Sequence, residues 1–324
     1  MAKAVRIHQT GGPEVLQLEE VEVGTPGEGQ ARIRQTAIGI NYIDTYHRSG
    51  LYPLPMPTGI GLEGAGTVEA VGPGVTDLSP GDRVAYAGGP VGAYASERVM
   101  PADRLVKVPE RISDQQAAAM MLKGMTVEYL IRRTFTVKAG DTVLFHAAAG
   151  GVGLIACQWL KAIGAHVIGT VSSDEKAALA KAHGCEFSVV YTREDFVARV
   201  KEITGGKGVP VVYDSVGKDT FARSLDCLQP RGMMVLFGAA SGPVPPFDSQ
   251  ILAQKGSLFL TRPTLFAYTA TREDLLASAS SLFNAVLSGE VKIEVSRTYP
   301  LAAAQQAHRD LQSRGTTGSL LLFP

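Results

Sequence analysis

A short turn of small residues, between positions 147 and 153, points most directly to chemistry in this sequence. Ala147, Gly150 and Gly153 are spaced three residues apart. The apolar run Thr142–Phe145 before the turn predicts a buried strand, and the periodic segment Leu154–Ile163 after it predicts a helix. Small residues let the backbone approach a pyrophosphate, and the helix N-terminus offers unpaired N–H groups. The pattern predicts a dinucleotide site; a tight turn that only packs a helix on a sheet is the alternative.

The end of the next predicted strand, near 166–171, indicates which dinucleotide is bound. Proteins that bind NAD place an acidic residue there to hold the adenosine ribose. This chain has Ser172 and Ser173 instead, and Lys176 follows shortly after. Ser172 and Glu175 also fit a helix capping box. Small hydroxyls beside a cation suit a 2′-phosphate, which favours NADP, although Lys176 also fits an ordinary exposed position on a helix.

Further strand ends supply candidate contacts to the same ligand. Tyr191 ends the predicted strand 187–190 and can cover an adenine. Ser215 lies in a turn of small residues after the strand 210–214, where ligands of parallel sheets bind. Phe237 and Ser241 flank the turn after the strand 233–237 and are candidates for contacts with a nicotinamide.

The pattern of predicted strands, helices and turns changes along the chain and divides it into parts. The first ~120 residues read as short alternating strands separated by Gly and Pro turns. From Asp141, strands and helices alternate, which is typical of a parallel sheet with helical crossovers. We expect a sixth strand near 257–261, and then two helices and a closing strand, near 272–288, 301–313 and 319–323. The predicted class is α/β, with a β-rich domain into which a doubly wound domain is inserted.

Composition narrows the partners and the compartment. The chain has 324 residues and a formal net charge of zero, without a basic stripe that would attract nucleic acid. No apolar run is long enough to cross a bilayer, and the N-terminus lacks a signal core. The three cysteines, Cys157, Cys185 and Cys227, are far apart, which favours buried thiols in a reducing cytoplasm.

Taken together, these motifs resemble the medium-chain dehydrogenase/reductase superfamily. The segments Asn41–Tyr52, Gly61–Gly66 and Gln254–Pro263, with the turn at 147–153, are most similar to its zinc-free, zeta-crystallin-like quinone oxidoreductases, especially the bacterial NADPH:quinone reductases. The resemblance implies a GroES-like catalytic domain formed by 1–122 and 264–324. It also implies a Rossmann domain, 123–263, that binds NADPH.

The metal ligands of the zinc alcohol dehydrogenases are missing. Where those enzymes have Gly-His-Glu, this chain has Gly61-Leu62-Glu63, and leucine cannot bind a metal. Asn41 and Asp44 occupy the region of the first ligand cysteine. We therefore expect no metal site, and we interpret Glu63 as a structural carboxylate.

The resemblance assigns residues to the coenzyme. Asn41 would lie near the nicotinamide, and Lys123 and Thr126 would approach it from the domain junction. The pyrophosphate would be held by Ala149, Gly150, Gly151 and Val152. The adenosine 2′-phosphate would be held by Ser172, Lys176, Tyr191 and Arg314, since a guanidinium suits bidentate phosphate contacts.

At the reacting end, the implied activity is reduction of a quinone beside the nicotinamide in the cleft between the domains. Tyr46 and Tyr52 follow Asn41 and can line a flat slot or donate to a quinone oxygen; shaping the wall only is the alternative. Either hydride or single-electron transfer fits. His146 fits a satisfied core histidine better than a base, and Cys157 fits packing.

Two other functions remain open from the sequence. The same fold can reduce the double bond of an enone or alkenal with NADPH, or the chain can be a binding protein that senses NADPH. RNA binding, the other role of a binding protein, is disfavoured by the zero net charge and the missing basic stripe. A homodimer is expected through an apolar edge strand near Gly256–Leu260, because unpaired strand edges invite pairing.

Overall fold

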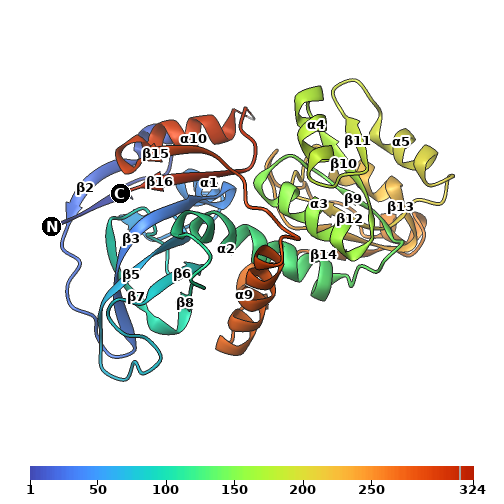
Figure 1. The fold of residues 1–324 in the computed structure, drawn as a ribbon. Helices are drawn as coiled ribbons and strands as arrows, with labels where there is room; N and C mark the ends of the chain where they lie inside the picture. The colour runs from blue at the N-terminus through green and yellow to red at the C-terminus, as the bar shows by residue number, and fades with distance from the viewer. Residues whose placement is uncertain (314) are drawn as a thin grey trace. The chain divides into compact units, whose positions relative to one another are not determined.

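The computed structural model describes residues 1–313 and 315–324. These residues form two compact units (Figure 1). The first comprises Met1–Met125, Thr269–Leu287 and Ile293–Pro324, and the second comprises Thr126–Tyr268 and Ser288–Lys292. Lys123, which the sequence analysis placed in the Rossmann domain, therefore groups with the first unit.

The first unit is built on strands that pair mainly antiparallel. One sheet has the order β15-β16-β3-β5-β6-β8, with β7 also paired to β3, and a smaller sheet has the order β2-β1-β4. Their bounds are β1 Ala2–Ile7, β2 Gln17–Val21, β3 Gln30–Ile40, β4 Thr58–Gly59, β5 Glu63–Val71, β6 Arg83–Ala87, β7 Glu97–Pro101, β8 Val106–Lys107, β15 Val295–Pro300 and β16 Ser319–Phe323. The helices are α1 Tyr42–Ser49, α9 Arg272–Leu287 and α10 Ala304–Gln312, the short η1 Pro13–Val15, η2 Ala102–Arg104 and η5 Leu301–Ala303, and most of α2 Asp114–Tyr129.

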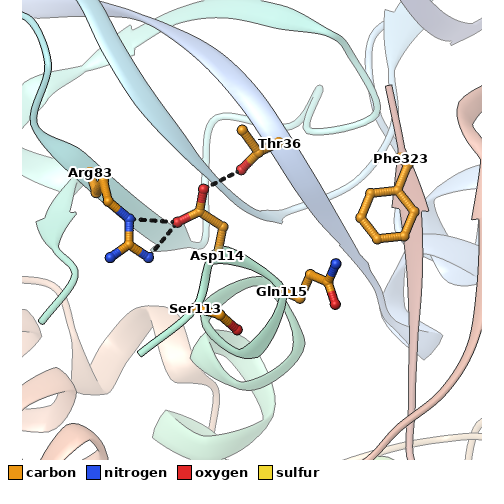
Figure 2. Close-up of a pocket in the computed structure, with 6 residues that line it drawn as sticks. All are labelled: Thr36, Arg83, Ser113, Asp114, Gln115 and Phe323. Atoms are coloured by element: carbon orange, nitrogen blue, oxygen red, sulfur yellow. Dashed lines mark hydrogen bonds and ion pairs between the residues drawn. The ribbon is translucent and has the colours of Figure 1, made fainter. Parts of the chain in front are cut away.

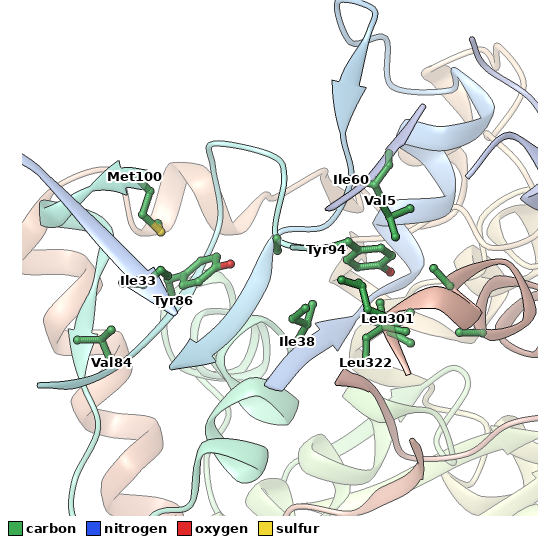
Figure 3. Close-up of a cluster of buried hydrophobic side chains, with 14 of the residues drawn as sticks. Val5, Ile33, Ile38, Ile60, Val84, Tyr86, Tyr94, Met100, Leu301 and Leu322 are labelled. Atoms are coloured by element: carbon green, nitrogen blue, oxygen red, sulfur yellow. The ribbon is translucent and has the colours of Figure 1, made fainter. Parts of the chain in front are cut away.

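A continuous apolar cluster fills the interior of this unit (Figure 3). Strand β3 contributes Ile33 and Ile38, both fully buried. The two residues are an odd number of positions apart, and the register shift between Gln35 and Ala37 in the pairing of β3 with β5 allows both to join the cluster. Leu322 of β16, near the end of the chain, is buried in the same cluster. The closing strand predicted at 319–323 is confirmed: β16 pairs antiparallel with β3 and so returns the C-terminal segment to the first unit.

The second unit is a doubly wound parallel sheet. Its strand order is β11-β10-β9-β12-β13-β14, and all of these pairs are parallel. The strands are β9 Thr142–Phe145, β10 His166–Val171, β11 Phe187–Val190, β12 Val209–Asp214, β13 Leu228–Leu236 and β14 Phe259–Thr261. The helices are α3 Gly151–Ile163, α4 Asp174–Ala182, α5 Phe196–Ile203, α6 Phe221–Ser224, α7 Gln250–Gln254 and α8 Leu265–Tyr268, with the short η3 Leu130–Thr134 and η4 Leu225–Cys227.

Two predicted elements are shorter than expected, each for a local reason. The first strand of this sheet, by contrast, has the predicted bounds Thr142–Phe145, and it ends before Ala147, which has a φ of 55°. Strand β14 starts at Phe259 because Ser257 has a φ of 56°, which no extended strand adopts. Helix α10 starts at Ala304, since η5 precedes it as a tighter turn.

Burial agrees with the expectations for the thiols. Cys157, Cys185 and Cys227 are all free and buried. Trp159, the one tryptophan of the chain, is buried in α3, with the guanidinium of Arg132 5.3 Å from its ring centroid. Within the described residues we find no helix with the length and apolar character needed to span a membrane.

Candidate functional site

The turn between β9 and α3 has the geometry of an anion cradle. Ala147 adopts a left-handed conformation, and its carbonyl accepts a hydrogen bond from Gly150 N at 2.9 Å. A Cβ on Gly153 would lie 2.4 Å from that carbonyl oxygen, so only glycine fits. Helix α3 then begins at Gly151, and the first N–H groups of a helix lack intrahelical acceptors. The predicted pyrophosphate residues Ala149, Gly150, Gly151 and Val152 all lie in this cradle, which fits a dinucleotide.

Beneath the turn, His146 is a satisfied core histidine, as predicted. Its Nδ1 lies 2.9 Å from Thr170 Oγ1 and its Nε2 lies 2.9 Å from Ser224 Oγ. Ser224 donates onward to Asp214 at 3.2 Å, so Nε2 must carry the proton that it donates to Ser224. Burial lowers the pKa of His146, so the ring is neutral at physiological pH. It ties the ends of β9 and β10 to α6 and takes no exposed position.

Asp214, which the sequence analysis did not single out, organises the loop after β12. Its Oδ1 accepts from Val216 N at 2.7 Å and Gly217 N at 3.0 Å. Its Oδ2 accepts from the hydroxyls of Thr220 at 2.7 Å and Ser224 at 3.2 Å. The signal was present: an aspartate ending an apolar strand before a turn of small residues folds that turn through its own side chain.

The predicted nicotinamide-side residues lie in two loops packed against each other. A Cβ on Gly238 would lie 2.4 Å from Ser215 O, so these loops approach at backbone distance. The Ser241 hydroxyl donates to Val216 O at 2.8 Å. The ring of Phe237 packs against Phe145, with centroids 5.8 Å apart. The structure therefore brings Ser215, Phe237 and Ser241 together at one edge of the sheet.

At the end of β10, the structure shifts one prediction by a residue. The N-cap of α4 is Ser173, whose Oγ accepts from Lys176 N at 3.3 Å, so the capping box predicted at Ser172 is wrong. Two adjacent serines both fit the pattern, and the backbone conformation decides between them. Ser172 is instead held by Thr192, whose hydroxyl donates to the Ser172 carbonyl at 3.2 Å.

Tyr191 lies beside this strand end. Its N–H donates to Val171 O at 3.1 Å, and its side chain is 42 % exposed, as a residue that covers a ligand must be. Ser172, Lys176 and Tyr191 thus gather around the end of β10. Arg314, the fourth residue predicted for this end, lies outside the described residues.

In the first unit, Asn41 is held by a buried carboxylate. Glu63 is fully buried and accepts from Asn41 Nδ2 at 2.7 Å, Lys123 Nζ at 3.3 Å and Leu122 N at 2.7 Å. The structure therefore brings the predicted residues Asn41 and Lys123 onto one acceptor, and it supports the interpretation of Glu63 as a positioning group. Thr126, on the same helix as Lys123, is buried and belongs to the second unit.

A chain of buried hydrogen bonds runs from Asn41 to α10. Asn41 N donates to Asp44 Oδ2 at 2.8 Å, and the Tyr94 hydroxyl donates to the same oxygen at 2.9 Å. His308 Nε2 lies 3.0 Å from the Tyr94 oxygen, and His308 Nδ1 lies 3.0 Å from Arg48 Nη1. A guanidinium can only donate, so Nδ1 accepts and Nε2 donates. Along this series of hydrogen bonds, every donor therefore points toward Asp44.

Burial sets the charge states in this chain. It raises the pKa of Asp44 to about 7, while the bonds from Asn41 and Tyr94 oppose that shift. In the described part of the chain, Asp44 Oδ1 is buried without a hydrogen-bond partner, so a charge there would go unsolvated. Burial, reinforced by the Arg48 charge, lowers the pKa of His308 to about 3, so this ring is neutral.

The predicted catalytic tyrosines form an aromatic cluster on α1 and the turn after it. The rings of Tyr46 and Tyr52 meet edge to face with centroids 5.2 Å apart, and Tyr52 N donates to Tyr46 O at 3.1 Å. Tyr42 packs edge to face on Tyr46 at 5.6 Å. Asn41 is the N-cap of the same helix, so Asn41, Tyr46 and Tyr52 share one short rigid segment.

Figure 2 shows a pocket in the first unit that is separate from these residues. Its volume is about 510 Å³, and it is lined by Thr36, Arg83, Ser113, Asp114, Gln115 and Phe323. Its charges are already paired, because Arg83 Nη2 donates to Asp114 at 2.6 Å and the Thr36 hydroxyl does so at 2.6 Å. None of the predicted site residues lines it.

The comparisons with known proteins agree with this geometry. Residues 27–110 match the alcohol dehydrogenase GroES-like domain family, and residues 151–279 match the zinc-binding dehydrogenase family. A quinone oxidoreductase of Pseudomonas aeruginosa is 54 % identical over 325 residues, covering all of both chains. The chain belongs to the quinone oxidoreductase family. It is a member of the medium-chain dehydrogenase/reductase superfamily, as the sequence resemblance predicted.

Two further members of the superfamily are similar along their whole length. The crystal structure of Escherichia coli quinone oxidoreductase complexed with NADPH has a TM-score of 0.98 and 53 % identity, covering 99 % of this chain and 100 % of that one. A 2-haloacrylate reductase of a Burkholderia species is 49 % identical, covering 100 % of this chain and 99 % of its own.

The zinc-binding name of one matched family contrasts with the residues in this chain. Leu62, which the sequence resemblance aligns with a histidine ligand of the zinc alcohol dehydrogenases, is buried in the core. Among residues 1–313 and 315–324, no group of three His, Cys, Asp or Glu side chains is arranged to hold a metal ion.

Asp44→Asn should change how stability depends on pH. Between about pH 4 and pH 7 the unfolded carboxyl ionises while the folded one stays protonated, so the free energy of unfolding of the wild type falls as pH rises. Asparagine removes this loss, and the variant should gain about 2–4 kcal/mol relative to wild type between pH 4 and pH 8. Urea unfolding at a series of pH values measures the difference.

A matched control is Asp82→Asn, because Lys107 lowers the pKa of Asp82 and that residue gives no such loss near neutrality. A difference between Asp44→Asn and wild type that stays constant from pH 4 to pH 8 would contradict the assignment.

Proposed function

We propose that this protein is an NADPH-dependent quinone reductase. The observation that carries the proposal is the kind of residues that follow the end of β10. Ser172 and Lys176, with a hydroxyl and a cationic side chain, follow β10 closely in the sequence, in the place where NAD-binding proteins use an acid to hold a ribose. The relatives named quinone oxidoreductase, one of them complexed with NADPH, support the same coenzyme and acceptor.

The second unit would hold the coenzyme along the carboxyl edge of its sheet. Ala149, Gly150, Gly151 and Val152 would bind the pyrophosphate through backbone N–H groups. Ser172, Lys176, Tyr191 and Arg314 would bind the adenosine end, and Ser215, Phe237 and Ser241 would border the nicotinamide end, with Lys123, Thr126 and Asn41 as further contacts. When bound, the reduced nicotinamide supplies the electrons.

The first unit would bind the acceptor through Asn41, Tyr46 and Tyr52. Glu63 fixes the Asn41 side chain, and Asp44 fixes its backbone, so the amide is held in one orientation before any ligand binds. The tyrosine rings offer flat faces, and their hydroxyls can donate to a developing oxyanion. A quinone accepts electrons readily, so we expect these residues to position it rather than to act as an essential acid.

We also propose that the reaction needs no zinc. The support is chemical. Leu62 has no donor atom, and the three cysteines are buried in the second unit, where Cys185 bonds to a carbonyl of β10 and Cys227 to a carbonyl of α6.

A second function is reduction of an activated carbon–carbon double bond, as in enones or alkenals. The 49 % identity to a 2-haloacrylate reductase favours it, because that relative differs little from the quinone oxidoreductases in its likeness to this chain. The quinone reading is preferred because the 54 % identical relative carries that name.

Steady-state oxidation of NADPH separates these readings. We expect 1,4-quinones to give higher kcat/KM than enones, alkenals or 2-haloacrylates, and NADPH to be preferred to NADH. Activity should persist after exhaustive dialysis against a chelator. Faster turnover of the unsaturated acids would support the second function, and activity that is lost on chelation and restored by zinc would refute zinc independence.

Tyr46→Phe and Tyr52→Phe test positioning against acid catalysis. Each change removes one hydroxyl donor and keeps the ring, so kcat/KM for a 1,4-quinone should fall by roughly two- to ten-fold, about the value of one hydrogen bond. Tyr42→Phe, on the same helix, is the matched control and should change little. A loss above about 100-fold at either position would instead identify an essential proton donor.

We further propose a cytoplasmic homodimer that pairs through β14. This strand lies at the edge of its sheet, and Phe259 is 58 % exposed on it. Light scattering should give twice the 34.2 kDa chain mass. Phe259→Glu should shift the equilibrium toward monomer, whereas Phe266→Glu, which changes another exposed phenylalanine but on α8, should not. A wild-type monomer at working concentration would overturn this proposal.

A further inference from the structure

An exposed ion pair lies at the strand end assigned to the 2′-phosphate. Arg193 Nη1 donates to Asp174 Oδ2 at 2.6 Å, and Arg193 Nη2 also bonds Asp174 Oδ1, so the pair is bidentate. Asp174 is the first residue of α4, directly after the N-cap Ser173. Arg193 follows Tyr191 by two residues in the loop after β11. The pair therefore bridges the two segments that present Tyr191 and Lys176.

The loop that carries Arg193 is fixed by its own hydrogen bonds. Tyr191 N donates to Val171 O at 3.1 Å, and Arg193 N donates to Val190 O at 3.0 Å. Thr192 donates to the Ser172 carbonyl at 3.2 Å. These bonds hold the Arg193 backbone close to the end of β10, so the position of the guanidinium does not depend on the ion pair alone.

The charges around this strand end would be unbalanced without Arg193. Asp174 and Glu175 open α4 with two carboxylates, and Lys176 is the cation that follows. Glu194 is turned away, because its side chain accepts from Val190 N at 2.8 Å and pairs with Arg199 at 3.4 Å. A phosphate monoester carries nearly two negative charges at neutral pH. An uncompensated Asp174 would repel it.

We propose that Arg193 determines specificity for the 2′-phosphate by neutralising Asp174. This inference rests on the proposed NADPH-dependent function and assigns a residue that supports the phosphate contacts without being one of them. The pair contributes little to folding, since the two side chains are 58 % and 66 % exposed. Its role is electrostatic: it cancels a carboxylate at the mouth of an anion site.

The same pair accounts for how an aspartate can occur here in an NADP-binding chain. An acid after β10 is the feature by which NAD-binding proteins hold a ribose and exclude the phosphate. In this chain the carboxylate is displaced by three residues from the end of β10 and engaged by a guanidinium on both oxygens. Its charge is thereby prevented from acting as that selector.

A double-mutant cycle on the full chain tests the proposal. Binding of adenosine 2′,5′-bisphosphate and of 5′-AMP is measured by calorimetry for wild type, Arg193→Gln, Asp174→Asn and the double variant. Arg193→Gln should weaken the bisphosphate by roughly three- to ten-fold, and Asp174→Asn should strengthen it by roughly three-fold. The double variant should return to within about two-fold of wild type, with 5′-AMP unchanged throughout. High salt should shrink the differences.

Arg34→Gln is the matched control, because it removes an exposed cation of the same kind from β3 in the first unit, where Arg34 pairs with Glu69. It should leave both ligands within two-fold of wild type. Circular dichroism and melting temperature confirm that each variant is folded.

The outcomes are distinct. If Arg193→Gln and the double variant lose the bisphosphate equally, Arg193 contacts the phosphate itself and the neutralisation proposal is wrong. If neither single change matters, the pair has no role in selectivity and the proposal is likewise wrong. If wild type does not prefer the bisphosphate over 5′-AMP, the NADPH assignment fails and this inference falls with it.

Discussion

The buried carboxylate of Glu63 is the constraint on which the arrangement of the first unit depends. It accepts from three donors at two places in the chain: the Asn41 side chain, and the Leu122 backbone and Lys123 ammonium next to each other on α2. An unpaired charge at this depth would be strongly destabilising, so its partners are fixed in place. Space for it comes from Gly39, where a Cβ would lie 2.2 Å from Glu63 Oε2. The glycine on β3 and the acid on β5 therefore act as one feature that orients Asn41.

The second unit also contains a buried carboxylate, but the hydrogen-bond donors around it are neutral. Asp214 is also fully buried, but two backbone N–H groups and two hydroxyls satisfy it. His146 joins this carboxylate, through Ser224, to Thr170 on the neighbouring strand. Two opposite edges of the proposed coenzyme site, the loop after β12 and the end of β10, thus share one hydrogen-bonded network. A ligand that contacts both edges meets a rigid surface, which reduces the ordering cost of binding.

The sequence predicted the succession of strands and helices along the chain and the turn at 147–153. Both were predictable because they depend on local periodicity and on residues that lack a Cβ. Sequence patterns missed what depends on distant partners. Asp44 and His308 belong to one hydrogen-bonded network. Arg48 and His308, which are bonded within it, are 260 positions apart, and no spacing rule links them. The choice of Ser173 over Ser172 as N-cap was also out of reach, since it depends on one pair of backbone angles. Arg193 stood unnoticed because its meaning lies in Asp174, nineteen positions away.

The burial of Trp159 in α3 determines what tryptophan fluorescence can report about unfolding of this protein. Because the sequence has one tryptophan, and it lies within helix α3 of the second unit, intrinsic indole emission observes that unit alone. A thermal melt followed by tryptophan fluorescence would show a single transition even when the first unit unfolds at another temperature. Methods that sense the whole backbone, such as calorimetry or hydrogen exchange, are the ones that would reveal two separate cooperative blocks.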